Sequence, residues 1–185
     1  MFLNIRKTEP RDLDRIAAIF DEARTAIAAL GIDQWQDGYP NRQSAEEDLL
    51  SGRGWVICGD GGEVLGVCAL IDDGEETYDR IEDGEWLTGN DNRSYLAVHR
   101  VAVSSDARRT GAASELMQFA AEYARDAGLG SVRIDTHEGN IRMRGMLEKN
   151  GFSLCGVIYL KNGDSRVAYE KRIGQTEERH EKTEL

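Results

Sequence analysis

The sequence predicts an α/β fold, in which helices cover both faces of one mixed sheet. Its 185 residues suffice for one domain with a sizeable core, and 40% of them are hydrophobic. Apolar residues alternate in some segments, as in strands, and recur every three or four positions in others, as in helices. The segments follow one another as a strand, two helices, three strands, a helix, a strand, a helix and two strands, which favours a single sheet packed against helices.

The first elements follow from local signals. Residues 2–8 alternate as a strand does, and Thr8 is expected to cap a long helix whose apolar positions continue to Gly31. A loop rich in turn-forming residues follows. Ser44 and Glu47 have the spacing of a capping box, which predicts a short second helix.

The middle of the chain contains a hairpin and the most regular strand. Gly61 and its glycine neighbour separate two apolar runs, as in a hairpin. Residues 72–85 are strongly acidic and predict an irregular connector. The run "SYLAVHRVAV", residues 94–103, is long and rich in β-branched residues, so it predicts a strand.

The last third repeats the alternation of helix and strand. An amphipathic helix ends at Gly128, residues 131–136 predict a strand, and residues 140–149 a helix. Asn162 and the glycine after it predict a type I′ turn in a terminal hairpin. The expected domain therefore spans residues 1–173, and residues 174–185 are expected to form a disordered tail.

Charge and composition exclude several classes of function. The net charge of −11 argues against a nucleic-acid binder, which needs a basic face. No apolar run approaches the ~20 residues of a membrane span, and the N-terminus lacks the layout of a signal peptide. The three cysteines lie in apolar stretches without metal-ligand spacing. We therefore expect a cytoplasmic protein without a metal, a membrane partner or a nucleic-acid partner.

One loop has the chemistry of an anion site. In "SSDARRTGAASEL", residues 104–116, two arginines precede Gly111, which allows a tight turn. The small residues after it leave the first amides of a helix uncovered, and those amides with the helix dipole favour a bound anion. The spacing matches neither the nucleotide P-loop nor the dinucleotide fingerprint.

At this loop the chain resembles the GNAT superfamily of acyl-CoA-dependent N-acyltransferases. The shared features are the motif R-x-x-G-x-A at Arg108, the strand "HRVAV" before it, Asn140 at a helix start and the pair "GF" at 151–152. The resemblance implies about seven strands, with a splayed central parallel pair that admits the coenzyme arm. It also implies acetyl-CoA as the acyl donor. The implied coenzyme-binding residues are Val101, Ala102, Val103, Arg108, Arg109, Thr110, Gly111, Ala112, Ala113, Ser114, Asn140 and Met143.

The chemistry that this resemblance implies is transfer of an acetyl group to a primary amine by direct attack through a tetrahedral intermediate. The backbone amide of Val101 can hold the oxyanion. His99 is the first candidate base; on an unbroken strand it shares a face with Val101, whereas a bulge would reverse its direction. His137, at the end of a strand, is a second candidate, and either histidine can instead be purely structural.

The acid that protonates the leaving thiolate is open. Related enzymes often place a tyrosine in the helix before the Gly-Phe pair, where this sequence has Leu147. Tyr159, Tyr95 or water can take that role. A thiol with a pKa of ~8.5 also leaves acceptably without an acid.

Four aromatic residues fall in segments that wall the acceptor pocket in this fold. They are Trp35, Tyr39, Tyr78 and Trp86. Together with the acidic connector they favour a cationic amine as the acceptor. Equally, the acidic residues can merely solvate a loop while the aromatic residues fill the core.

Two classes of function remain open at this point. The first is an acetyl-CoA-dependent N-acetyltransferase that acts on a small molecule or on a peptide or protein amine. The second is a non-catalytic CoA-binding sensor or interaction module with the same fold, which the missing tyrosine favours. The terminal hairpin can also offer an edge for pairing with a second copy as a homodimer.

Overall fold

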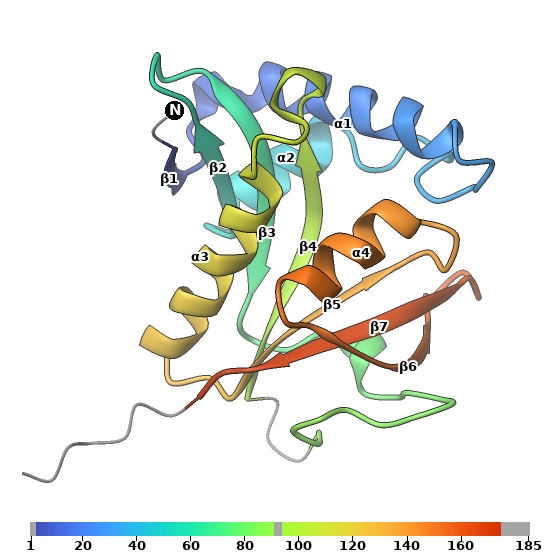
Figure 1. Ribbon diagram of the computed structural model, residues 1–185. Helices are drawn as coiled ribbons and strands as arrows, with labels where there is room; N and C mark the ends of the chain where they lie inside the picture. Colours follow the sequence, from blue (N-terminus) through green and yellow to red (C-terminus); the bar gives the residue numbers. More distant parts are fainter. Residues whose placement is uncertain (1–2, 91–93, 175–185) are drawn as a thin grey trace, which may run out of the picture.

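The computed structural model describes residues 3–90 and 94–174, and within them a seven-stranded sheet has the order β1-β2-β3-β4-β5-β7-β6 (Figure 1). Every neighbouring pair is antiparallel except β4 and β5. The strands are β1 (Asn4–Lys7), β2 (Gly54–Cys58), β3 (Val64–Ile71), β4 (Tyr95–Val103), β5 (Ser131–Thr136), β6 (Ser153–Tyr159) and β7 (Ser165–Arg172). This confirms the predicted mixed sheet and the predicted order of helices and strands.

Four α-helices and three short 3-10 turns complete the described fold. The helices are α1 (Leu13–Ala28), α2 (Arg42–Leu50), α3 (Ala112–Asp126) and α4 (Ile141–Lys149). The turns are η1 (Pro10–Asp12), η2 (Glu76–Tyr78) and η3 (Ser105–Ala107). None of the described helices is long and apolar enough to cross a bilayer.

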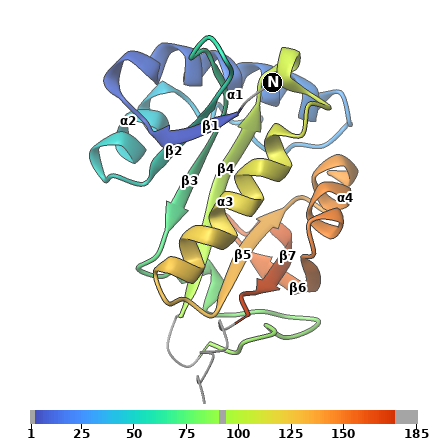
Figure 2. The same cartoon turned by 60° about the vertical axis from the view of Figure 1, so that its left-hand side comes forward.

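The helices cover the two faces of the sheet in pairs (Figures 1 and 2). The face under α3 and α4 contains the largest core cluster, which includes Leu116 of α3 and Leu147 of α4. The opposite face packs against α1 near β2 and β3, and against the connector of residues 72–90 near β4 and β7. The sheet is therefore buried on both faces, which explains why β3 is buried at every position.

Two predicted helix starts are wrong. The first helical turn begins after Glu9, which forms a capping box with Asp12, whereas Thr8 uses its backbone amide to extend the pairing of β1 with β2. In α2 the cap is Asn41, which forms its box with Ser44. In both places more than one polar residue near the helix start is able to cap the free amides. The spacing of residues alone therefore did not identify which one is the cap.

The parallel pair β4–β5 splits partway along its length. Only the first three residues of β4, from Tyr95 to Ala97, pair with β5. After Ala97 the two strands no longer pair, and they diverge, as Figure 1 shows. The β5-facing backbone groups of β4 past Ala97 thus lack partners from that strand.

A β-bulge lies in β4 at Arg100. His99 pairs with Ala69 and Ala102 pairs with Val67, so β4 has one residue more than β3 between these pairs. Arg100 has a φ of 53°, and its guanidinium closes on Asp48 of α2 with N–O distances of 2.7 and 2.5 Å. The ion pair between β4 and α2 holds the extra residue in place.

The bulge decides between the two orientations left open for His99: it does not share a face with Val101 and Val103, as it would on an unbroken strand. Val101 and Val103 pack against the cluster under α3, whereas the ring of His99 lies 6.0 Å from that of Tyr78 on the opposite face. The inserted residue reverses the alternation of side chains along the strand.

The terminal hairpin differs from the prediction in its turn. The loop spans residues 160–164, and Gly163 alone within it has a positive φ, 91°. A type I′ turn requires positive φ at two residues, so this turn is of another type. The edge of β6 is not free along its whole length, because Glu82 pairs with Val157 and the amide of Glu85 donates to Cys155. The predicted tail beyond residue 174 lies outside the described residues.

Arg133 and Glu170 form a fully buried ion pair between β5 and β7. Both side chains are 0% exposed, and Nε of Arg133 lies 2.9 Å from a carboxylate oxygen of Glu170. The guanidinium lies between the rings of Trp86 and Tyr95, with its carbon 4.2 and 4.0 Å from the ring centroids. Thr88 also donates to Glu170 at 2.6 Å, so the pair fixes the connector to the sheet.

Candidate active site

A cavity of about 1200 Å³ opens where β4 and β5 diverge. Its walls come from the split strands, the loop after α1, the turn η2, the start of α4 and the hairpin between β6 and β7. Its lining includes Gln34, Trp35, Tyr39, Glu75, His99, Val101, Asp135, Asn140, Met143 and Arg166. The site therefore lies where the ends of separate elements meet, at the opening in the sheet.

The loop between β4 and α3 presents amides without acceptors. Gly111 has a φ of 94° and caps α3, whose first hydrogen bond is from Glu115 to the Gly111 carbonyl. Within residues 3–90 and 94–174, no acceptor is hydrogen-bonded to the amide of Arg109 or to the four amides of residues 111–114. The amides of residues 111–114 belong to the first turn of α3 and its cap, where the helix dipole is positive. These free amides are what the predicted anion site requires, and anion binding itself stays a prediction.

Nothing would obstruct a group that approaches Gly111. A Cβ placed on that glycine would meet no atom within 4 Å. Arg108 and Arg109 are exposed beside it, and Ala113 and Ser114 are partly exposed in the first helical turn. Thr110 instead closes the local turn, because its hydroxyl donates to the Ala107 carbonyl at 2.7 Å.

The loop is anchored to α1 through Glu22, which the sequence did not single out. One carboxylate oxygen of Glu22 accepts from the amide of Ser105 at 2.6 Å, and the other from Arg15 at 2.9 Å. These contacts lower the pKa of Glu22, the Ser105 amide most strongly. Arg108 donates to the Glu22 backbone carbonyl at 3.3 Å, so its side chain lies back over α1.

His99 faces the cavity beside a carboxylate. Its Nε2 lies 3.3 Å from Oε2 of Glu75, and the two side chains are 20% and 19% exposed. Nε2 is itself shielded from solvent and makes no hydrogen bond of acceptable geometry, so the two groups are in close contact without a formed bond. Burial lowers the pKa of His99, while Asp135 and Glu75 oppose the shift. The neutral imidazole, the form that accepts a proton, is thereby favoured.

Glu75 is held rigidly by its surroundings. Its other carboxylate oxygen accepts from the amide and the hydroxyl of Thr77, at 3.1 and 2.9 Å. Its backbone amide and carbonyl both bond to the hydroxyl of Tyr95, at 3.1 and 3.3 Å. Thr77 and Tyr95 thus orient the carboxylate toward His99. In the sequence Glu75 was one of many acids in the connector, without a signal of its own.

The other candidate catalytic side chains lie away from this pair. His137 does not line the cavity; its Nδ1 accepts from the Gly139 amide at 3.0 Å, and its Nε2 lies 3.6 Å from Asp33. Tyr159 is 47% exposed on β6 and also lies outside the lining. Leu147 is completely buried in the core, and the hydroxyl of Tyr95 is engaged by Glu75.

The four aromatic candidates divide into two groups. Trp35 and Tyr39 line the cavity, and the Tyr39 hydroxyl accepts from Arg100 at 2.8 Å. Tyr78 and Trp86 are core residues, 0% and 5% exposed. The Tyr78 hydroxyl donates to Asp135 at 2.8 Å, which fixes that carboxylate at the cavity wall.

The cavity lining is acidic, but most of its acids come from outside the connector. The lining carboxylates are Asp33, Asp37, Glu47, Glu75, Asp135 and Asp164. Of the connector acids singled out by their density in the sequence, Glu75 alone is in this lining. Glu82 and Glu85 use their backbones to cover the edge of β6 instead.

Asn140 and Met143 line the cavity at the start of α4. The Asn140 side chain caps the helix by accepting from the Met143 amide at 3.3 Å, and it donates to Gln34 at 3.2 Å. The same Gln34 oxygen is within 3.4 Å of the Thr136 hydroxyl and of the His137 amide. Gln34 therefore joins the loop after α1 to the end of β5. A lone glutamine in a loop gave no sequence signal.

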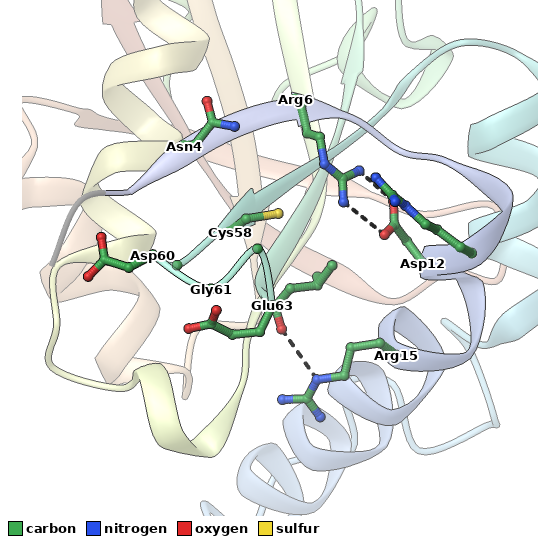
Figure 3. A pocket seen from close by; sticks show the side chains of 12 residues that line it. Asn4, Arg6, Asp12, Arg15, Cys58, Asp60, Gly61 and Glu63 are labelled. Atoms are coloured by element: carbon green, nitrogen blue, oxygen red, sulfur yellow. Dashed lines mark hydrogen bonds and ion pairs between the residues drawn. The ribbon is translucent and has the colours of Figure 1, made fainter.

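A second cavity of about 770 Å³ lies at the other side of the molecule, between β1, the start of α1 and the β2–β3 turn (Figure 3). Its three arginines are already paired: Arg6 with Asp12 at 2.6 Å, Arg11 with Glu9 at 2.7 Å and Arg15 with Glu22 at 2.9 Å. It shares no lining residue with the split of β4 and β5. Among the described residues, no group of three or more His, Cys, Asp or Glu side chains could hold a metal ion.

Comparison with known proteins gives a consistent result. Residues 14–152 match the acetyltransferase (GNAT) family. A GNAT-family acetyltransferase from Streptococcus agalactiae is 39% identical, with a TM-score of 0.84 over 94% of this chain and 96% of that one. No curated protein matches the sequence.

More distant solved structures share the fold. A GNAT-family acetyltransferase from Listeria monocytogenes is 21% identical, with a TM-score of 0.68 over 92% of this chain and 94% of that one. Ard1 from Thermoplasma volcanium is 16% identical, with a TM-score of 0.68 over 95% of this chain and all of that one. At these identities the likeness concerns architecture alone.

Proposed function

Because this chain belongs to the acetyltransferase (GNAT) family, we propose that it transfers an acetyl group from acetyl-CoA to a primary amine. One observation supports this most directly: β4 leads from a cavity that contains His99, opened by its divergence from β5, into a loop of amides without acceptors. The loop can hold a diphosphate, and the histidine can take a proton from an amine.

The residues fit the coenzyme end of this proposal. Acetyl-CoA, when bound, supplies an acetyl group activated as a thioester. The amides of residues 111–114, with Arg109, would hold its pyrophosphate through charge-assisted hydrogen bonds. The backbone of β4 at Val101, Ala102 and Val103, which lacks pairing on its β5 side, would hold the pantetheine arm. Asn140 and Met143 border the same opening at α4.

The residues also fit the chemical step. The amine arrives as an ammonium and must lose one proton before its nitrogen forms a bond to the acetyl carbon. The tetrahedral intermediate then loses a second proton from nitrogen to solvent, the carbon–sulfur bond breaks, and sulfur leaves as a thiolate. His99 would accept the first proton, with Glu75 stabilising the imidazolium that results. The amide of Val101 would hold the oxyanion. Leu147 offers no proton, so solvent would protonate the departing thiolate.

Two measurements test the proposal. Calorimetry with CoA should show binding, and release of free thiol from acetyl-CoA should depend on an added primary amine. Binding without turnover across a broad amine panel would contradict catalysis and favour a non-catalytic CoA-binding module. Absence of any CoA binding would overturn the assignment of the loop itself.

A further inference from the structure

Arg166 is a buried cation at the wall of the active-site cavity. It is the second residue of β7, its side chain is 8% exposed, and it lines the cavity together with His99 and Asp135. The register explains the placement. Asp135 pairs with Ala168, and Arg166 lies two residues before Ala168, so it projects from the same face of the sheet.

The guanidinium of Arg166 has few acceptors. One terminal nitrogen donates to the carbonyl of Ser165 at 2.7 Å, and the other lies 3.6 Å from Asp164, beyond hydrogen-bond distance. The nearby oxygen of Asp164 accepts instead from the side-chain Nδ2 of Asn162 at 2.9 Å. In the part of the chain that the structure describes, no carboxylate is hydrogen-bonded to Arg166.

Arg100, the neighbouring arginine of the cavity, shows the contrast. Its guanidinium donates twice to Asp48 and once to Tyr39. Lys161, the third cation of the lining, is 82% exposed and paired with Glu76 at 2.8 Å. Arg166 is thus the cation of this lining that is buried without a hydrogen-bonded carboxylate. The ion pair with Asp164 at 3.6 Å leaves hydrogen-bond donors of this guanidinium available to an anionic partner from solution.

The fork of an arginine matches a carboxylate in both geometry and charge. We propose that Arg166 binds the carboxylate of the acceptor, so that the acceptor is a small free amino acid. This inference rests on the proposed acetyl transfer. The ammonium of such an acceptor would lie toward His99, where Glu75 and Asp135 supply negative charge. A zwitterion satisfies both ends of the cavity, whereas a simple amine leaves Arg166 without its partner.

Matched acceptors test the inference. Each of a panel of free amino acids is compared with its primary carboxamide, which retains the amine and removes the negative charge. We expect the wild-type protein to favour the free acids by about 10–100-fold in kcat/KM, as expected for a lost charged hydrogen-bond pair. R166Q should abolish this preference through a higher KM for the acids, leaving the carboxamides unchanged, and R166K should retain part of it.

The control and the fold check use the same strand. R172Q alters an exposed arginine of β7 whose guanidinium donates to Leu87, away from the cavity, and should leave the preference intact. Circular dichroism and thermal unfolding establish that R166Q is folded. Equal loss of activity on acids and carboxamides in R166Q would overturn the inference.

The outcomes separate this inference from the proposed function. Turnover of carboxamides and simple amines with no preference for a carboxylate would overturn the role of Arg166 and leave acetyl transfer standing. If no amine is acetylated, calorimetry on CoA-saturated protein still decides the question. Heat from an amino acid that R166Q removes supports the site, and absence of such heat across the panel overturns it.

Discussion

The Nε2 atom of His99 lies 3.3 Å from Oε2 of Glu75, with both side chains about four-fifths buried at the cavity. The carboxylate is fixed from the other side by Thr77 and Tyr95, so the pair is preorganised. A carboxylate in this position stabilises an imidazolium without itself taking the proton. Because Nε2 faces Glu75, Nδ1 is the nitrogen that would accept the proton of a substrate.

Replacing His99 should remove most of the catalysis and little of the binding. H99Q is expected to lower kcat by about 10²–10⁴-fold, the usual contribution of a general base, with an unchanged Kd for CoA. H137Q is the matched control, because His137 lies outside the lining and should affect turnover much less. Thiol release and calorimetry measure the two quantities. A larger loss in H137Q would move the base to that residue.

The pH profile of kcat/KM should report the burial of His99. Burial lowers its pKa below the ordinary value of 6.5, so the neutral form, and with it the activity, should persist below that pH. Glu75 partly opposes this shift, because its negative charge favours the imidazolium. E75Q removes that charge, so the acidic limb should move to still lower pH while the maximal rate falls.

The control for this profile is E47Q. Glu47 lines the same cavity but has no contact with His99 among the described residues, so the acidic limb should stay in place. Movement of the limb to higher pH in E75Q would show that the carboxylate does not act on His99.

Covering the amides at the start of α3 should weaken coenzyme binding. A113E places a negative side chain over the first helical turn, and loss of one charged hydrogen bond to a phosphate corresponds to about a 10–100-fold higher Kd for CoA. Q118E introduces the same residue on an exposed position farther along the same helix and should change Kd little. Calorimetry compares the two variants, and equal affinities would refute the loop as the diphosphate site.

The buried pair Arg133–Glu170 should be far more important to stability than an exposed pair. E170Q leaves the Arg133 charge buried without its carboxylate, so the free energy of unfolding should fall by about 3–5 kcal/mol. The comparison is D73N, which breaks the Arg53–Asp73 pair; those side chains are 38% and 64% exposed, and its loss should cost at most ~1 kcal/mol. Urea unfolding measures both, and a similar small loss in E170Q would contradict this role.

Local patterns were sufficient for the order of the elements and for the glycine turn before α3. The apolar spacing of α1 and α3, the β-branched content of β4 and the glycine at 111 are all properties of consecutive residues, so the sequence reveals them directly. The caps at Glu9 and Asn41 were missed because several adjacent polar residues could serve, and packing selects among them.

Features that depend on residues far apart in the chain could not be predicted from local sequence patterns. The bulge at Arg100 requires Asp48 of α2, and Glu75 matters because the chain returns it to His99. Gln34 gains its role from α4 and the end of β5, which lie 102 to 106 residues farther along. Tyr78 and Trp86 lie in a connector between regular elements, which suggested that they would be exposed. The connector instead folds their side chains into the core, where substrate cannot contact them.

The extra residue in β4 separates two segments whose side chains alternate out of phase. Before it, His99 projects into the cavity on the face away from α3; after it, Val101 and Val103 pack under α3. Under the proposed function, the side chain at position 99 can therefore change without altering the main chain after the insertion, which would hold the acyl donor. Loss of this one residue would reverse the orientation of the upstream side chains in a single mutational event.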